Sequence, residues 1–138
     1  MDALAAYSHA LVALAGFAVI VLLLSPVSAL AKQKAGLAPG GTPAEDYANP
    51  AYRLNRAYLN GCETLPIFLT VTLLAILAGA APFWVNMLAS LVLVTRILMV
   101  IVHIRGIGRA QAGARTIFYV TGWALMLGLA ILALVALF

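Results

Sequence analysis

Charged residues are scarce in this chain. Asp, Glu, Lys and Arg together make up 9% of its 138 residues, against about a quarter in an ordinary soluble domain. A single cysteine, Cys62, excludes an internal disulfide and a cysteine-rich metal site, and we expect no bound metal. The formal net charge is only +4, and no basic run is interleaved with aromatic residues. The sequence therefore does not support binding to nucleic acid.

Apolar residues dominate what remains. They make up 65% of the chain, and the mean hydropathy is +1.10. A soluble fold of this size could not bury so much apolar surface, which excludes a soluble enzyme and a disordered chain. We therefore expect an integral membrane protein with a single domain over residues 1–138 that contacts the lipid bilayer.

Three long uncharged segments define the spans. A membrane helix needs roughly 20 mostly apolar residues, and the segments 3–31, 64–95 and 116–138 carry no charge. The second segment is too long for one span, and a turn with Gly79 and Pro82 interrupts it. The apolar runs are continuous rather than alternating, which favours helices over a β-barrel. The sequence predicts an all-α, four-helix membrane bundle with helices at about 5–30, 53–79, 83–105 and 114–138.

The first span has an alternative interpretation as a cleaved signal peptide. The segment Ala29-Leu30-Ala31 resembles a cleavage site. The residues before the apolar run include Asp2 and no Lys or Arg, and the run is longer than a signal sequence requires. We therefore expect the span to be retained.

The cations indicate the orientation. Seven of the eight lie in or beside the connections between the first two and the last two helices: Lys32, Lys34, Arg53, Arg56, Arg105, Arg109 and Arg115. Because cytoplasmic loops carry an excess of Lys and Arg, we expect both connections in the cytoplasm and both chain termini outside. We expect the protein in the inner (plasma) membrane of a bacterium. The first connection, at about 32–51, is rich in Gly and Pro and predicts an irregular surface loop.

Polar residues inside the spans are spaced to share helix faces. Arg53, Arg56, Asn60 and Glu63 follow one another at i, i+3, i+7 and i+10, which places them on one face of the second helix. Arginines near the end of a membrane helix can also be explained by side chains that reach the polar surface of the membrane. This alternative does not explain why Asn60 and Glu63 continue the stripe toward the interior.

The third and fourth helices carry similar stripes. Arg96 and His103 lie seven residues apart, and Arg115 and Tyr119 lie four apart. Polar groups within a span usually face the interior of a bundle. We therefore expect a cationic pocket near the cytoplasmic leaflet, which suits an anionic, water-soluble ligand.

One buried ion pair is also expected. Arg96 lies nine residues from Arg105 and Glu63 lies seven from Arg56, so the two charges stand about 13 and 10 Å into the bundle at the helical rise of about 1.5 Å per residue. A buried charge without a partner is costly, and we expect Glu63 and Arg96 to pair.

The second-helix stripe resembles a family pattern. In the MAPEG family, the membrane-associated proteins in eicosanoid and glutathione metabolism, this helix opens with Arg-x-x-Arg-Ala-x-x-Asn-x-x-Glu-x-x-x-x-Phe. Six positions match here: Arg53, Arg56, Ala57, Asn60, Glu63 and Phe68. Arg96 resembles an arginine in the third helix of family members. Arg115 and Tyr119 resemble an arginine in their fourth helix that is followed four residues later by a tyrosine.

The resemblance implies a homotrimer of four-helix bundles with glutathione sites between subunits. It implies that Arg115 activates the thiol of glutathione, the co-substrate, and that Arg53, Arg56, Asn60, Glu63 and Tyr119 bind it. We add Arg96 and His103 to the binding residues because of their spacing. The sequence departs from the best-studied members at Leu59, Met99 and His103.

The expected function is that of a membrane glutathione transferase or peroxidase acting on hydrophobic electrophiles. The alternative is a non-catalytic membrane protein whose buried polar cluster serves assembly. A small transporter is less favoured, because the helices show no broken pair and no inverted repeat.

Overall fold

The computed structural model describes residues 2–38, 40–108 and 113–138, which leaves Pro39 and Arg109 outside the described residues. Within these ranges every regular element is a helix. The helices are α1 (Asp2–Ala5), α2 (Ser8–Lys34), α3 (Pro50–Leu77), α4 (Pro82–Arg105) and α5 (Ala114–Leu137). The four long helices are each long and apolar enough to cross a membrane. The expected all-α bundle with four membrane spans is thus confirmed.

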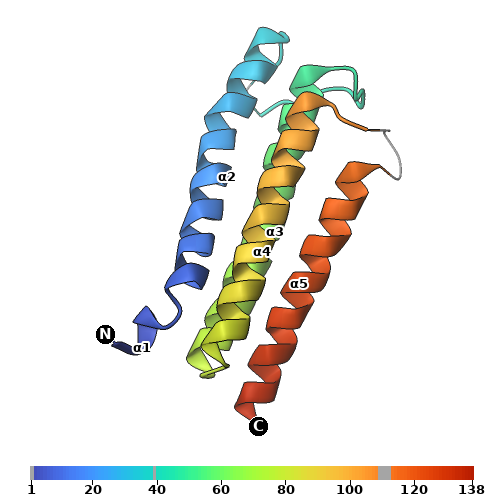
Figure 1. The fold of residues 1–138 in the computed structure, drawn as a ribbon. Helices are drawn as coiled ribbons and strands as arrows, with labels where there is room; N and C mark the ends of the chain where they lie inside the picture. The colour runs from blue at the N-terminus through green and yellow to red at the C-terminus, as the bar shows by residue number, and fades with distance from the viewer. Residues whose placement is uncertain (1, 39, 109–112) are drawn as a thin grey trace.

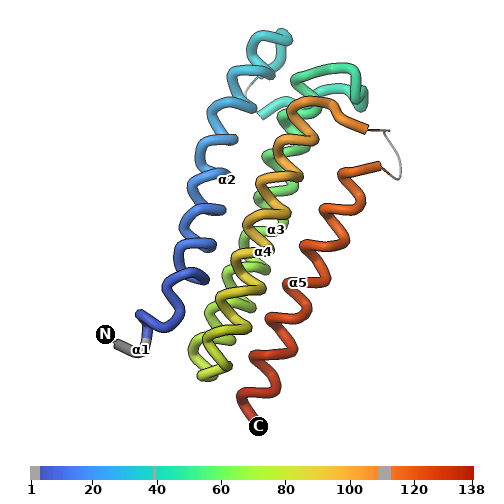
Figure 2. The backbone as a smooth tube through the Cα atoms, viewed as in Figure 1, coloured from blue at the N-terminus to red at the C-terminus, as the bar shows by residue number. Residues whose placement is uncertain are grey.

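The four long helices run alternately up and down (Figure 1). The carboxyl ends of α2 and α4 and the amino ends of α3 and α5 lie together at one end, which we call the loop end (Figure 2). The short α3–α4 turn and both termini lie at the opposite end. α3 and α4 contact each other and both outer helices, α2 and α5. This order places the polar stripes of α3, α4 and α5 at the loop end.

Local sequence explains where α3 and α4 begin and end. α3 begins at Pro50, three residues before the predicted start, because the Asn49 side chain accepts a hydrogen bond from the Ala51 backbone N–H and Pro50 fits the first helical position. The turn after α3 uses Gly79 with a φ of 73°. α4 ends at Gly106, whose φ of 65° is the left-handed conformation that commonly terminates a helix.

The start of α2 is tied to the α3–α4 hairpin by hydrogen bonds in both directions. The Tyr7 hydroxyl donates to the Ala80 carbonyl oxygen at 2.6 Å. The Asn86 amide donates to the Ala6 carbonyl oxygen and accepts from the Ala10 N–H. The two Asn86 bonds satisfy backbone groups where the chain breaks between α1 and α2, so α2 begins at Ser8 rather than near residue 5.

The core lies mainly between α2, α3 and α4. α2 buries a stripe whose members alternate three and four residues apart: Ala10, Leu14, Phe17, Val21, Leu24 and Ser28. Gly61 of α3 allows a close approach, because a Cβ atom there would lie 2.8 Å from Val21 Cγ2. Many large apolar side chains on the outer faces are exposed, as expected for helices that meet lipid or another chain.

Candidate functional site

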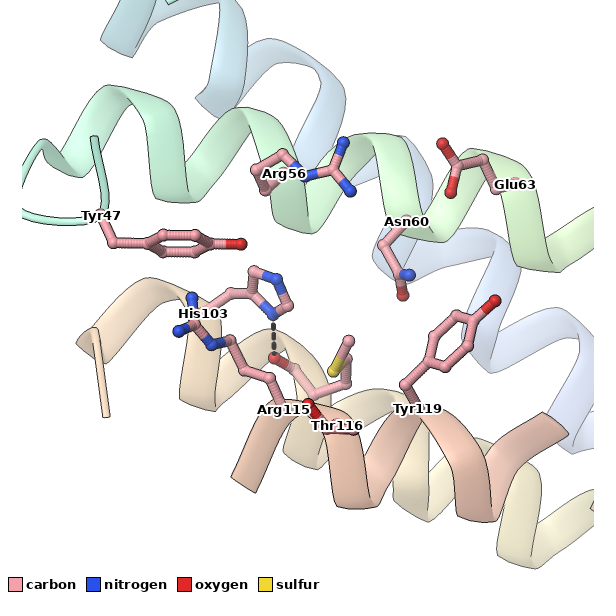
Figure 3. Close-up of a pocket in the computed structure, with 9 residues that line it drawn as sticks. Tyr47, Arg56, Asn60, Glu63, His103, Arg115, Thr116 and Tyr119 are labelled. Carbon is pink, nitrogen blue, oxygen red and sulfur yellow. Dashed lines mark hydrogen bonds between the residues drawn. The ribbon is translucent and has the colours of Figure 1, made fainter. Parts of the chain in front are cut away.

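A cavity of about 300 Å³ opens at the loop end between α3, α4 and α5 (Figure 3). Its lining residues are Tyr47, Arg56, Asn60, Glu63, Met99, His103, Arg115, Thr116 and Tyr119. We call it the large cavity, because it is larger than the cavity that adjoins it deeper in the bundle. It brings together six of the eight residues that the sequence singles out, and leaves out Arg53 and Arg96. Its volume lies at the lower end of the about 300–1,000 Å³ of small-molecule sites.

α3 supplies one wall of the large cavity. Arg56, Asn60 and Glu63 lie one helical turn apart and descend from the loop end into the bundle, as Figure 3 shows. Arg56 is half-buried, Asn60 is buried and Glu63 is exposed at the side of the helix. The cavity wall thus changes from cationic to neutral to anionic with depth.

α5 supplies the opposite wall. Arg115 stands in its first turn and is buried, and Tyr119 follows one turn later. The guanidinium carbon of Arg115 lies 3.7 Å from the ring centroid of Tyr47. Two guanidinium groups and one carboxylate therefore border the large cavity, which gives it a net positive charge with one anionic corner.

His103 is held in a defined orientation on α4. Its Nδ1 lies 3.0 Å from the Met99 carbonyl oxygen, and the ring is buried. A carbonyl oxygen can only accept, so Nδ1 carries a proton. In the neutral ring Nε2 is then an acceptor, and Figure 3 shows the ring between Tyr47, Arg56 and Arg115. This geometry gives the large cavity a group that can accept a hydrogen bond.

Arg96 is fully buried beside the large cavity, at 1% exposure. Its Nη2 donates to the carbonyl oxygens of Phe118 at 2.9 Å and Tyr119 at 3.4 Å. Its Nη1 donates to Asn60 Oδ1 and Thr64 Oγ1, both at 3.4 Å. Arg96 thus connects α4 to both α3 and α5 through neutral oxygens.

The expected ion pair between Glu63 and Arg96 is wrong. Within the described residues, the oxygens that Arg96 contacts belong to Asn60, Thr64 and the α5 backbone, and Glu63 is exposed. Glu63 lies at the expected depth along α3 but on the wrong face of the helix. Asn60 and Thr64, four residues apart, face α4, whereas the Glu63 side chain is turned away from α4. Both charged residues border a smaller cavity of about 100 Å³ that shares Glu63 and Tyr119 with the large one.

Gly122 makes room for the Arg96 guanidinium. A Cβ atom at Gly122 would overlap Arg96 Nη2, and it would lie 2.9 Å from Thr95 Oγ1. Gly122 is buried on the α5 face that meets α4. The absence of a side chain here allows α5 to approach α4 closely enough for its backbone carbonyls to accept from Arg96.

Arg53 belongs to a different arrangement from the one that the sequence suggests. Its Nη1 donates to the carbonyl oxygens of Tyr47 at 2.7 Å and Ala48 at 2.9 Å. Its side chain also lies against Gly106, where a Cβ atom would stand 3.1 Å from Arg53 Nε. Arg53 therefore holds the α2–α3 connection to the loop end of the bundle, and its guanidinium is directed to the backbone rather than to the large cavity.

Three lining residues escaped the sequence analysis as site residues: Tyr47, Met99 and Thr116. Met99 lies between Arg96 and His103 on the same face, so helical spacing could have found it. Thr116 follows Arg115 directly, and only the position of α5 in the structure shows that it lines the cavity. Tyr47 lies in a connection without periodicity. Within residues 2–38, 40–108 and 113–138, no group of three or more His, Cys, Asp or Glu could hold a metal ion.

Comparison with known proteins gives one family. The model described as the MAPEG family matches residues 8–135, which is nearly the whole chain. No curated protein and no solved structure gives a significant match.

Proposed function

Because this chain belongs to the MAPEG family, we propose that it is a membrane-embedded, glutathione-dependent transferase or peroxidase that acts on hydrophobic electrophiles. The observation that carries the proposal is the large cavity, in which Arg56, Asn60, Glu63, His103, Arg115 and Tyr119 converge from three helices. In the family, the residues that resemble Arg56, Asn60, Glu63, Arg115 and Tyr119 contribute to the glutathione site, whereas His103 is a departure from the family pattern.

The charges of the large cavity complement glutathione. The tripeptide carries two carboxylates, one ammonium group and a thiol. Arg56 can bind a carboxylate through its planar guanidinium, the exposed Glu63 carboxylate can accept from the ammonium group, and Asn60 can bind peptide groups. Arg115 then remains for the sulfur. The cavity therefore offers a group of opposite charge to one carboxylate, to the ammonium group and to the thiolate.

Arg115 would stabilise the glutathione thiolate. A guanidinium stays protonated near neutral pH and cannot act as a base, so its role is electrostatic. His103 Nε2, which the bond from Nδ1 to Met99 leaves as an acceptor, can accept a hydrogen bond from the thiol. The thiol proton then passes to the solvent, because a further positive charge on the buried ring between Arg56 and Arg115 is unfavourable. The thiolate sulfur then forms a bond to the electrophilic carbon, and the leaving group departs with its bonding pair. Glutathione binding to the parent should therefore release a proton, which a pH indicator in weak buffer would detect, and Arg115→Ala should release much less.

The electrophile would reach the thiolate from the bilayer. The smaller cavity shares Ile67, Trp123 and Met126 with an apolar pocket of about 180 Å³ between α3 and α5. Three adjoining cavities therefore follow one another along these two helices, from the polar large cavity to apolar side chains of α3 and α5. Lipid-soluble electrophiles fit such a series of cavities.

We also propose a homotrimer with the large cavity at the subunit interface. Glu63 is an exposed carboxylate on the side of a membrane span, and such a charge facing lipid is costly. A neighbouring subunit would cover it and complete the cavity wall. We propose that the loop end faces the cytoplasm, because the described Lys and Arg residues other than Arg96 lie in or beside the connections at that end. The proposed location is the inner membrane of a bacterium.

Thermal unfolding of the purified protein in detergent tests the proposal. A ligand that binds only the folded protein stabilises it, by about 2.7 kcal/mol at 100 times its Kd. Glutathione and S-methylglutathione should both raise the Tm, since the thiol is not needed for binding. The Arg56→Met variant should lose the shift, and the Arg105→Met variant should keep it, because Arg105 is exposed outside the cavity.

A conjugation assay with hydrophobic aromatic electrophiles completes this test. The non-catalytic alternative has some structural support, because the buried Arg96 contacts join three helices as an assembly element would. A Tm shift with glutathione and measurable conjugation support the proposed function. No Tm shift and no turnover with any electrophile would favour the alternative.

A further inference from the structure

Among the nine described residues that line the large cavity, Tyr47 alone comes from a connecting segment. Its ring faces the Arg115 guanidinium at 3.7 Å from carbon to centroid, well within the about 6 Å over which a cation and an aromatic ring attract. In Figure 3 the ring extends across the mouth of the cavity, between the amino end of α3 and Arg115. The α2–α3 connection therefore reaches a cation on the last helix.

Two residues of α3, Arg53 and Tyr52, hold Tyr47 in position. The two hydrogen bonds from Arg53 Nη1 end on the carbonyl oxygens of Tyr47 and Ala48. The ring of Tyr52, which is buried, meets the Tyr47 ring edge to face at 5.1 Å and 85°, a favoured geometry for aromatic pairs. Arg53 fixes the backbone of the segment and Tyr52 fixes the ring, so the ring presents one face to Arg115.

We propose that Tyr47, held by Arg53, is a positioning residue for Arg115. This inference rests on the proposed function, in which Arg115 stabilises a thiolate. A long arginine side chain loses considerable rotamer freedom when its guanidinium is fixed in one place. The Tyr47 ring restricts the Arg115 guanidinium and keeps water from one of the guanidinium faces. The connection thereby keeps Arg115 in the orientation that the reaction requires. Arg53 acts through the loop backbone and not on the ligand.

The expected effect falls on kcat. A cation–π contact of this kind contributes about 1–2 kcal/mol when partly shielded from water, which converts to about 5- to 30-fold in rate. Because the contact acts through a group that stabilises the thiolate, Tyr47→Leu should lower kcat by this factor and change the KM for glutathione less than about twofold. Tyr47→Phe and Tyr47→Trp keep an aromatic face and should retain most of kcat.

Arg53→Met separates this role from ligand binding. It keeps the length of the side chain but removes the donors to the loop, so kcat should fall as in Tyr47→Leu while the KM for glutathione stays near that of the parent. The double variant should be no slower than Tyr47→Leu alone, because both changes remove the same restraint. Arg105→Met is the matched control at the same end of the bundle and should equal the parent.

Ligand-free unfolding distinguishes failure of this proposal from failure of the proposed function. In a cycle of Tyr47→Leu and Arg115→Ala, the Tm loss of the double variant should be smaller than the sum of the single losses. Additive losses, a kcat for Tyr47→Leu within twofold of the parent, or a multiplied loss in the Tyr47/Arg53 double variant would each overturn the positioning role. A parent without turnover or glutathione binding would overturn the proposed function, and the Tm cycle would still decide whether Tyr47 restrains Arg115.

Discussion

Replacing Gly122 with Ala should destabilise the protein far more than a glycine-to-alanine change in a helix usually does. The new Cβ atom would overlap Arg96 Nη2, which donates to the Phe118 and Tyr119 carbonyl oxygens. The nearest obstacle is a fully buried guanidinium that is hydrogen-bonded to both α3 and α5, so it has little space to move. Either Arg96 or α5 must shift.

The magnitude follows from what Arg96 loses. A buried charge deprived of its partners costs about 3–5 kcal/mol, and hydrogen bonds to charged groups contribute about 1.5–3 kcal/mol each. Alanine recovers about 1 kcal/mol of helix propensity over glycine. We therefore expect the free energy of unfolding to fall by about 2–4 kcal/mol.

Unfolding in mixed micelles would measure this loss for Gly122→Ala, Arg96→Met and the double variant. In the Arg96→Met background the alanine should cost clearly less, because the main obstacle is gone and only the close contact with Thr95 Oγ1, at 2.9 Å, remains. Gly16→Ala is the matched control, since its Cβ would lie 3.4 Å from Leu93 Cδ2, an ordinary contact. If Gly122→Ala proves as mild as Gly16→Ala, or costs the same without Arg96, the reasoning is refuted.

Three further predictions concern the site and the assembly. Arg115→Ala should lower the conjugation rate about 10²–10³-fold, the usual cost of losing an electrostatic stabiliser, while Arg115→Lys restores part of it and Arg105→Ala, the control, changes little. Glu63→Gln should weaken glutathione binding, and its effect on stability should add to that of Arg96→Met without coupling, because the two residues form no ion pair in the described chain; a strong coupling would restore the pairing. Native mass spectrometry in mild detergent should show a trimer, and a lone monomer would count against a site shared between subunits.

Helical periodicity predicted much of the site. Once α3 is a helix, Arg56, Asn60 and Glu63 must share a face, and the same holds for Arg115 and Tyr119 on α5. Sequence length and uncharged segments were enough to predict four antiparallel spans, and so to bring these faces to the loop end. The large cavity follows from these two rules.

The remaining features depend on contacts between elements, which periodicity does not encode. Arg96 and Glu63 have matching depth, yet the rotation of α3 directs Asn60 and Thr64 at Arg96. Gly122 has a packing role that only the closeness of α4 and α5 reveals. Tyr47 lies in a connection whose path is set by Arg53, a residue that the stripe on α3 had suggested for the ligand.

The ultraviolet absorbance of the thiolate tests the central claim most directly. Glutathione added to the parent protein near neutral pH should give a difference spectrum with the thiolate band, because in the proposed arrangement Arg115 lies beside the bound sulfur and lowers the free energy of the ionised thiol. Arg115→Ala should bind glutathione without this band, and S-methylglutathione should give none with either protein. No thiolate band in the parent at saturating glutathione, or an equal band in Arg115→Ala, would contradict the account.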